Sequence, residues 1–337
     1  MNPALHCSSF YSRHFSIRRW LSALLCSLSI GITSSSFAAV GLNTRDDNPM
    51  LQKIYLPTLS ASDNPGWQFS HLAVATNTYQ KEIETSEFLI MDVELYRYEF
   101  SLGYQWDDWR VTAKTPIISF QSGALDSVID QFHDLFQLPE GGRRLTANDK
   151  INLVYMRNGL VVFSQDFRDS GLGDIAVSLT RHISQQNNIT SEISIGVEIP
   201  TGNRAVFGGG GGIDYALWLT HIRELNPSVM VYGLFGLSYL DTNEFVEQFQ
   251  TKSVSFSQVG IEYSFTHSII FILQLDMHSA IIKDSALNAF GSSLQMQGGF
   301  KLKSWLKHYD VDFFVAEDIK VGSSPDVAFG MRFVKKH

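Results

Sequence analysis

Between Gly66 and Phe333 the chain repeats one unit about a dozen times: roughly ten residues in which apolar and polar side chains alternate, followed by a connection. Successive side chains of a β-strand point to opposite faces, so each unit is a strand with one apolar and one polar face. The connections are alternately short and long. Tight turns on one side and larger loops on the other are typical of a closed up-and-down barrel in a membrane. The pattern predicts an all-β, transmembrane, antiparallel β-barrel.

We predict twelve strands, an even number, as single-chain bacterial barrels require if both chain ends are to lie on one side of the membrane. With the N-terminus on the periplasmic side, every longer connection falls on the cell exterior. The predicted strands span residues 67–79, 88–105, 109–120, 173–183, 189–200, 212–223, 228–240, 252–266, 269–280, 292–303, 309–319 and 325–334.

The first 38 residues have the order of a secretory signal peptide. Three arginines precede an apolar run from Trp20 to Ile32, and small residues up to Ala38 follow it. The run is too short to span a bilayer comfortably, and its flanks suit cleavage better than anchoring. We therefore predict a cleaved signal peptide at 1–38, a periplasmic or plug-like segment at 39–65, and the barrel at 66–334.

Both cysteines, Cys7 and Cys26, lie in the predicted signal peptide. A mature chain without cysteine excludes disulfides, thiolate metal sites and a cysteine nucleophile. The same segment contains three arginines and no acidic residue, so its removal changes the formal net charge from −8 to −11. Such an acidic chain is a poor partner for nucleic acid, and no pattern in it predicts a cofactor.

The final predicted strand ends on an aromatic residue close to the chain terminus. In it Val327, Phe329, Met331 and Phe333 alternate with small or polar residues, and residues 334–337 extend past the last aromatic. This resembles the terminal signature by which outer-membrane barrels are recognised for assembly. It predicts an outer-membrane location, with membrane lipid and the barrel-assembly machinery as partners.

One long connection, residues 121–172, breaks the strand pattern. Residues 124–137 carry apolar side chains at helical spacing, which predicts an amphipathic helix in an exterior loop. Its apolar stripe must pack against something, either the mouth of the barrel or the outer leaflet. A small hairpin is predicted after it, with strands at 151–156 and 160–164 joined through Asn158-Gly159. The polar face of the helix consists of Asp126, Asp130, His133 and Asp134.

Four motifs occur in the connections and at strand ends: the run from Asp126 to Arg144, Gly171-Leu-Gly-Asp174, Pro200-Thr-Gly202 and the glycine run before Asp214. Together they resemble an uncharacterised secreted family, domain of unknown function 3187. The similarity extends from Asn48-Pro49 to the last strand and implies a barrel without an established activity. The shorter elements are also similar to barrels of the phenol-degradation meta-pathway family, which are thought to move hydrophobic compounds.

Strand alternation assigns charged side chains of both signs to the barrel interior. A mixed interior fits either a pore for small solutes or a plugged core held by salt bridges, because twelve strands leave room for only a narrow channel. The predicted lumen-lining residues are Arg110, Lys114, Glu192, Glu198, Asp214, Glu262 and Arg332.

Two pairs of residues permit a hydrolase hypothesis. Asp276 and His278 lie two apart on one strand and should share the inner face, and Asp92 and Glu94 should enter the barrel at a similar height. Carboxylates beside an aspartate–histidine pair resemble the arrangement of outer-membrane aspartyl-type surface proteases, which activate a water molecule. A polar network that only satisfies its own hydrogen bonds is the simpler interpretation.

The acidic face of the predicted loop helix could coordinate a cation, because residues i, i+4, i+7 and i+8 lie on one side of a helix. A solvated surface is the simpler interpretation, so we predict no metal site. The sequence favours a channel or transporter for small molecules, hydrophobic ones included, over an enzyme. The alternatives are a surface hydrolase that uses Asp276 and His278, and a closed barrel for envelope structure or surface recognition.

Overall fold

The computed structural model describes residues 40–59, 65–123, 125, 131, 150–186, 188–203, 209–241, 249–320 and 322–335. No helix in this part of the chain has the length and apolar character to cross a membrane. The long strands are β1 (Gly66–Ile83), β2 (Glu87–Trp106), β3 (Trp109–Gln121), β7 (Ile175–Gln186), β8 (Ile189–Ile199), β9 (Asp214–Asn226), β10 (Val229–Tyr239), β11 (Ser253–Ser264), β12 (Ile269–His278), β13 (Ser293–Leu306), β14 (Tyr309–Asp318) and β15 (Val327–Lys335). The short elements are the 3₁₀ turns Pro49–Lys53 and Asn288–Phe290 and the strands β4 (Asn152–Arg157), β5 (Leu160–Gln165) and β6 (Asp169–Leu172).

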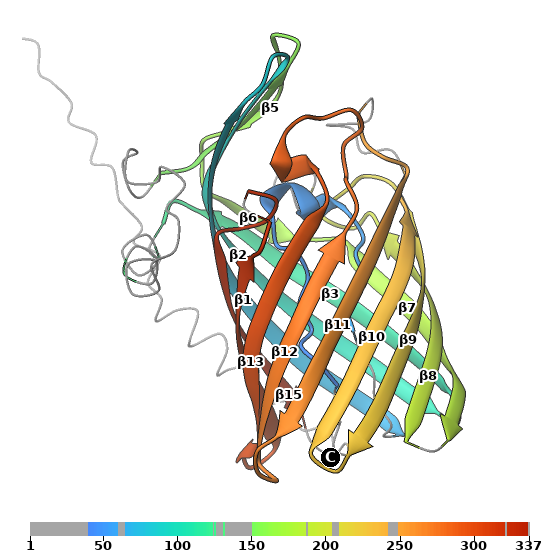
Figure 1. Cartoon of the computed structure of the whole chain (residues 1–337). Coiled ribbons are helices and arrows are strands. Elements are labelled where there is room, and N and C mark those ends of the chain that lie inside the picture. Colours follow the sequence, from blue (N-terminus) through green and yellow to red (C-terminus); the bar gives the residue numbers. More distant parts are fainter. Residues whose placement is uncertain are drawn as a thin grey trace, which may run out of the picture. The chain divides into compact units, whose positions relative to one another are not determined.

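The twelve long strands form one closed antiparallel barrel (Figure 1). Each strand pairs with its neighbour in the chain, and β3 pairs with β7 across the long connection. β1 also pairs with β15, from Ser70 opposite Val334 to Asn77 opposite Val327, and this pairing closes the wall. The predicted all-β, antiparallel closed barrel and its number of strands are confirmed.

The two ends of the barrel differ in their connections. At the end where β1 begins, which we call the turn end, the connections are only two to four residues long. At the opposite loop end they reach 53 residues between β3 and β7. The predicted strands 67–79 and 88–105 left an eight-residue loop between them, which is wrong. β1 and β2 continue to Ile83 and Glu87 and leave only a three-residue turn.

The extra length of β1 and β2 carries a small sheet beyond the loop end (Figure 1). β4 pairs with β2 from Asp92 to Glu87, and β5 pairs with β4. Asn158 and Gly159 join β4 to β5 with φ angles of 52° and 76°, as a hairpin turn of the predicted Asn-Gly type requires. The apolar inner face of this sheet packs on Phe290 of the β12–β13 loop; its members are Leu89, Met91, Leu153, Tyr155 and Phe163.

The outer face of the barrel is apolar and the inner face is mostly polar. Phe235 and Leu237 of β10 are 62% and 61% exposed, whereas their neighbours Leu234 and Ser238 are fully buried. An exposed apolar belt of this kind suits lipid, because a barrel in water would place its apolar side chains inward. Exposed aromatic residues lie near both ends of the belt, as interfacial girdles do; they are Trp67, Tyr104, Trp106, Tyr215, Tyr239, Tyr263 and Trp305.

The predicted loop helix at 124–137 lies almost entirely outside the described residues, and its polar face lies wholly outside them. Asp126, Asp130, His133 and Asp134 therefore stay predictions.

Candidate functional site

Residues 40–59, which we call the inner segment, lie inside the barrel (Figure 1). From residue 40 the chain climbs from the turn end towards the loop end along β11 and β12. Hydrogen bonds at four successive heights define this path: Gly41 N to Glu262 Oε1 (2.6 Å), Leu42 N to Gln274 Oε1 (3.1 Å), Thr44 Oγ1 to Asp276 Oδ2 (2.6 Å) and His278 Nε2 with Asp46 Oδ2 (3.0 Å).

The inner segment reverses direction near the loop end through the 3₁₀ turn Pro49–Lys53, which the side chain of Asn48 caps by accepting from Met50 N. The returning part follows β9, β10 and β11 towards the start of β1. Its bonds to the wall are Tyr55 N to Asp214 Oδ2 (3.3 Å), Ser238 Oγ to Tyr55 O (2.6 Å) and Leu59 N to Gln258 Oε1 (2.8 Å).

Asp47 of the inner segment forms a two-point ion pair with Arg97 of β2. Arg97 Nε lies 2.7 Å from Asp47 Oδ1, and Arg97 Nη2 lies 3.0 Å from Asp47 Oδ2. The remaining nitrogen, Nη1, donates to Glu99 Oε2 at 2.9 Å. Lys114 of β3 is 3.6 Å from the other oxygen of Glu99. Asp47 and Arg97 are deeply buried, and Glu99 and Lys114 are mostly buried. Charged hydrogen bonds are strong in such surroundings, and an unpaired charge is costly.

Asp276 and His278 both point into the barrel, but they bind the inner segment. Thr44 donates to Asp276, while His278 contacts Asp46, which also accepts from Ser324 Oγ at 2.7 Å. The other ring nitrogen of His278 faces the carbonyl of Ser279 at 2.8 Å. Both predicted catalytic side chains therefore have their hydrogen-bonding groups occupied by protein atoms.

Asp92 and Glu94 lie on the outer face of β2, which corrects the predicted inward placement. The continuous register with β1 puts Asp92 opposite Tyr79 and Glu94 opposite Asn77, on the same face as the exposed Tyr104. The prediction was wrong because the polarity of the two faces of β2 is exchanged beyond the barrel. In that part of β2 the inward side chains are apolar and pack under a loop. The hydrolase constellation is therefore not assembled.

All seven residues predicted to line the lumen lie on the inner face of the wall. Arg110 and Glu192 form a second two-point pair, at 3.1 and 2.9 Å, between β3 and β8. Lys301 and Glu262 are 3.2 Å apart. Arg332 pairs with Asp312 of the neighbouring strand. The other three residues, Lys114, Glu198 and Asp214, face the inner segment or the cavity beside it.

The sequence analysis missed Arg97, Glu99 and Asp312 as inward-facing residues. For Arg97 and Glu99 a signal was present, since counting back along β2 by twos from the inward Gln105 reaches both. No such signal exists for Asp46 and Asp47, because the inner segment has no regular period.

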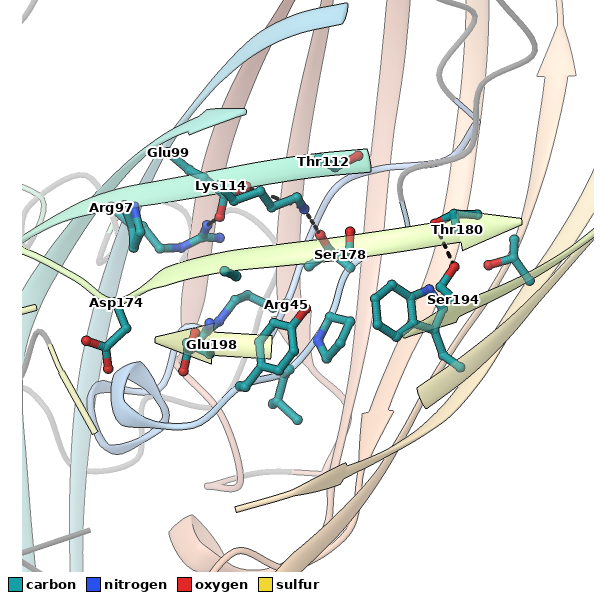
Figure 2. A pocket seen from close by; sticks show the side chains of 18 of the residues that line it. Arg45, Arg97, Glu99, Thr112, Lys114, Asp174, Ser178, Thr180, Ser194 and Glu198 are labelled. Carbon is teal, nitrogen blue, oxygen red and sulfur yellow. Dashed lines mark hydrogen bonds and ion pairs between the residues drawn. The ribbon is translucent and has the colours of Figure 1, made fainter. Parts of the chain in front are cut away.

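A small polar cavity remains between the inner segment and the wall formed by β2, β3, β7 and β8 (Figure 2). Its volume is about 60 Å³, which is room for a few water molecules and far below the roughly 300 Å³ of small-molecule sites. In the described ranges no three His, Cys, Asp or Glu side chains are grouped so that they could hold a metal ion. The charged and hydroxyl groups at the cavity include Arg45, Arg97, Glu99, Lys114, Glu198, Thr112, Ser178, Thr180 and Ser194.

The opposite side of the lumen is apolar and is covered by the returning part of the inner segment. Tyr55, Leu56 and Leu59 belong to one buried cluster with Trp218 and Tyr232 of the wall. Each fully buried side chain of this size contributes up to about 1.5–3 kcal/mol. The inner segment is therefore held by both apolar packing and ion pairs.

Asp174 connects the motifs that the chain shares with its predicted family. Its two carboxylate oxygens accept N–H groups from Gly202 and Gly210, each at 2.7 Å. Beside it, Thr201 Oγ1 accepts from Ile175 N at 3.0 Å. Burial raises the pKa of Asp174, while the N–H donors oppose that shift. The Gly-Leu-Gly-Asp, Pro-Thr-Gly and glycine-run elements therefore form one structural unit that holds the β8–β9 loop on β7.

We expect Asp174→Ala to destabilise the barrel by about 1–3 kcal/mol, because it leaves two N–H groups without their acceptor. Urea-induced unfolding in detergent micelles, followed by tryptophan fluorescence, measures this change. Asp169→Ala is the matched control, since Asp169 accepts only an exposed bond from Ser170, and its effect should stay within roughly 0.5 kcal/mol. Equal effects of the two substitutions would contradict the structural role of Asp174.

Comparison with solved structures finds barrels of similar architecture. The COG4313 outer membrane channel from Pseudomonas putida F1 superimposes with a TM-score of 0.56 at 13% identity, over 81% of this chain and 96% of that one. The NanC porin gives a TM-score of 0.46 at 6% identity, over 80% and 100% of the two chains. The CymD monoaromatic hydrocarbon channel gives 0.43 at 12% identity, over 91% and 95%. The first of these likenesses shows a common fold.

The family comparison agrees with the motifs identified in the sequence. No curated protein matches this chain. The model of the family described as "Protein of unknown function (DUF3187)" matches residues 24–336, which is nearly the whole chain. The chain belongs to the DUF3187 family, as its loop and glycine motifs predicted.

Proposed function

We propose that this protein is an outer-membrane channel for small polar solutes, and that the inner segment is a plug that closes it. One observation carries the proposal: the inner segment fills the lumen yet stays separate from the wall, which is complete without it. The barrel strands close through β1 and β15, so removal of the segment would leave an intact cylinder. Twelve strands are enough for a narrow water-filled channel.

The location follows from the apolar belt and the predicted signal peptide at 1–38. In this proposal the loop end faces the cell exterior and lipid surrounds the belt. The terminal strand, which ends in the aromatic Phe333 and two further ordered residues, delivers the chain to the barrel-assembly machinery. Short turns on the periplasmic side and longer loops outside are the usual arrangement of such barrels.

The chemistry of the lumen favours polar solutes over hydrophobic ones. The wall that faces the remaining cavity carries charged groups and hydroxyls on β3, β7 and β8, among them Lys114, Ser178 and Glu198. The apolar wall residue Tyr232 lies under the plug, while Trp218 packs against the plug and also borders the cavity. A solute that enters beside the plug therefore meets mostly hydrogen-bonding groups.

The start of the long connection between β3 and β7 contacts the outer face of β2. The N–H of Leu125, at the start of the loop, donates to Glu94, which points away from the lumen. Glu94 is nevertheless only 1% exposed. In this proposal the inner segment is the part of the chain that closes the lumen.

A surface hydrolase is the weaker candidate. Asp276 and His278 are bonded to the inner segment, and the carboxylates expected beside them lie on the other side of the wall. A catalytic pair needs a water molecule and a substrate within hydrogen-bond reach. If the inner segment never leaves the lumen, the remaining alternative is a closed barrel that serves envelope structure or surface recognition.

Replacement of residues 42–58 by a Gly-Ser linker tests the channel. We expect the mean current in planar bilayers to rise by at least about tenfold, because the closed state loses the segment that stabilises it. Liposomes that contain the variant should also swell faster in small sugars.

The native protein is the control, and both forms should migrate differently on a gel before and after boiling, as folded barrels do. A folded variant that conducts no better than the native protein would contradict the proposed function.

A further inference from the structure

The ion pair between Arg97 and Asp47 differs from the other buried arginine pairs of the barrel. Three arginines point inward from the described wall strands: Arg97, Arg110 and Arg332. Arg110 and Arg332 each pair with a carboxylate of the wall, Glu192 and Asp312. Arg97 alone makes its two-point contact with a carboxylate of the inner segment. That carboxylate leaves if the inner segment leaves.

The surroundings of Arg97 make the loss of its Asp47 partner energetically costly. Its cross-strand neighbours on the inner face are Val74 of β1 and Ile118 of β3, and the next inward residue of β2 is Leu95. All three are at least 96% buried, and Arg97 itself is 2% exposed. Without Asp47 the guanidinium would keep only the single bond to Glu99. A buried charge that loses its partner is destabilised by several kcal/mol unless another anion replaces it.

We propose that Arg97 is the binding site for the carboxylate of a small organic acid, and that Asp47 occupies this site until such a solute displaces it. The proposal deepens the proposed function and rests on it, since it names the class of solute that opens the plug. A planar carboxylate matches the pair of nitrogens that Arg97 now presents to Asp47.

The neighbours of the site define the rest of the solute. The inward-facing neighbours of Arg97 in the wall, Val74, Leu95 and Ile118, are all apolar. They favour a short hydrocarbon or an aromatic ring as the body attached to the carboxylate. The adjacent cavity of about 60 Å³ is too small for such a molecule. The solute must therefore take the place of Asp47, and its binding is coupled to displacement of the inner segment.

Glu99 acts as a positioning residue. It holds Arg97 Nη1 at 2.9 Å and is itself close to Lys114 at 3.6 Å. These contacts lie within the wall and persist when the inner segment moves. The two nitrogens that face Asp47 thus stay directed into the lumen, ready for another carboxylate.

Calorimetry of benzoate binding to the full chain in detergent tests the site. Asp47→Asn should raise the affinity for benzoate by at least about tenfold, because it removes the competing carboxylate. Asp169→Asn is the control: it makes the same charge change at a residue outside the inner segment, where the carboxylate accepts an exposed bond from Ser170. It should change the affinity by no more than about twofold. Arg97→Gln should abolish binding, and benzamide, which is neutral and nearly the same shape, should not bind any variant.

The outcomes separate this inference from the proposed function. Equal benzoate affinity of the native and Asp47→Asn proteins, or equal binding of benzamide, would overturn the carboxylate site even if the unplugged barrel conducts. Benzoate binding that depends on Asp47 and Arg97 in a barrel that never conducts would support the site and contradict the channel. The gel shift on boiling confirms that each variant is folded, and Asp47→Asn keeps the test decisive if Arg97→Gln fails to fold.

Discussion

Substitution of Gly196 by valine should open the lumen and raise the mean current in planar bilayers by at least about tenfold. Gly196 points inward from β8, and a Cβ atom there would lie 2.2 Å from the hydroxyl oxygen of Tyr55 and 3.0 Å from the ring of Trp218. Atoms cannot approach that closely, so Tyr55 must leave its position. Tyr55 belongs to the inner segment, and its displacement also weakens the bonds of its backbone to Asp214 and Ser238.

The barrel itself should tolerate the change, because valine suits a strand and the pairing of β8 with β7 and β9 involves only backbone atoms. Gly298→Val is the matched control. Gly298 lies on the outer face of β13, and a Cβ atom added there meets nothing within 4 Å. A folded Gly196→Val protein with native current would show that the inner segment does not close the lumen.

Substitution of Arg97 by methionine should destabilise the folded protein by about 3–5 kcal/mol, since it removes the closest cation from two buried carboxylates. Asp47 keeps only Arg45 at 4.0 Å, and Glu99 keeps only Lys114 at 3.6 Å. The two-point bond to Asp47 and the bond to Glu99 are lost together. Urea titration of the protein in detergent micelles gives the free energy of unfolding. The temperature at which the folded form disappears from a gel provides a second measure.

Two comparisons make the Arg97 experiment specific. Arg181→Met also removes an arginine, but Arg181 is exposed and only stacks on Trp109 at 5.2 Å, so its loss should cost no more than about 1 kcal/mol. Asp47→Asn combined with Arg97→Met should be less destabilised than Arg97→Met alone, because the double variant no longer buries the unpaired Asp47 charge. A simple addition of the two single effects would contradict the ion pair.

Much of the wall was predictable from local sequence. Alternation in strands such as 189–200 assigns Glu192 and Glu198 inward, and the structure places both there. Local periodicity is sufficient because each strand must present one face to lipid and the other to the lumen. The same rule failed at Asp92 and Glu94, where β2 has left the lipid-facing part of the barrel and a loop covers its inner face.

The candidate site was only partly predictable. Asp276 and His278 were correctly expected to share the inner face, but their partners Thr44 and Asp46 come from a segment without a periodic pattern. The sequence contains the Asp47 carboxylate and the Arg97 guanidinium, yet nothing in the spacing of 50 residues pairs them. Alternation reports which face a side chain occupies and carries no information about what lies opposite it.

The sequence by itself determined the strands, their number, the polarity of the two faces and the family. Only the tertiary structure decided between the periplasmic and plug-like alternatives for the segment before the barrel, by placing residues 40–59 in the lumen, and paired Arg97 with Asp47. The physical reason is the range of the interactions. Strand periodicity is set by neighbours along the chain, whereas the bond from Leu42 to Gln274 joins residues 232 positions apart and exists only once the barrel has closed around the inner segment.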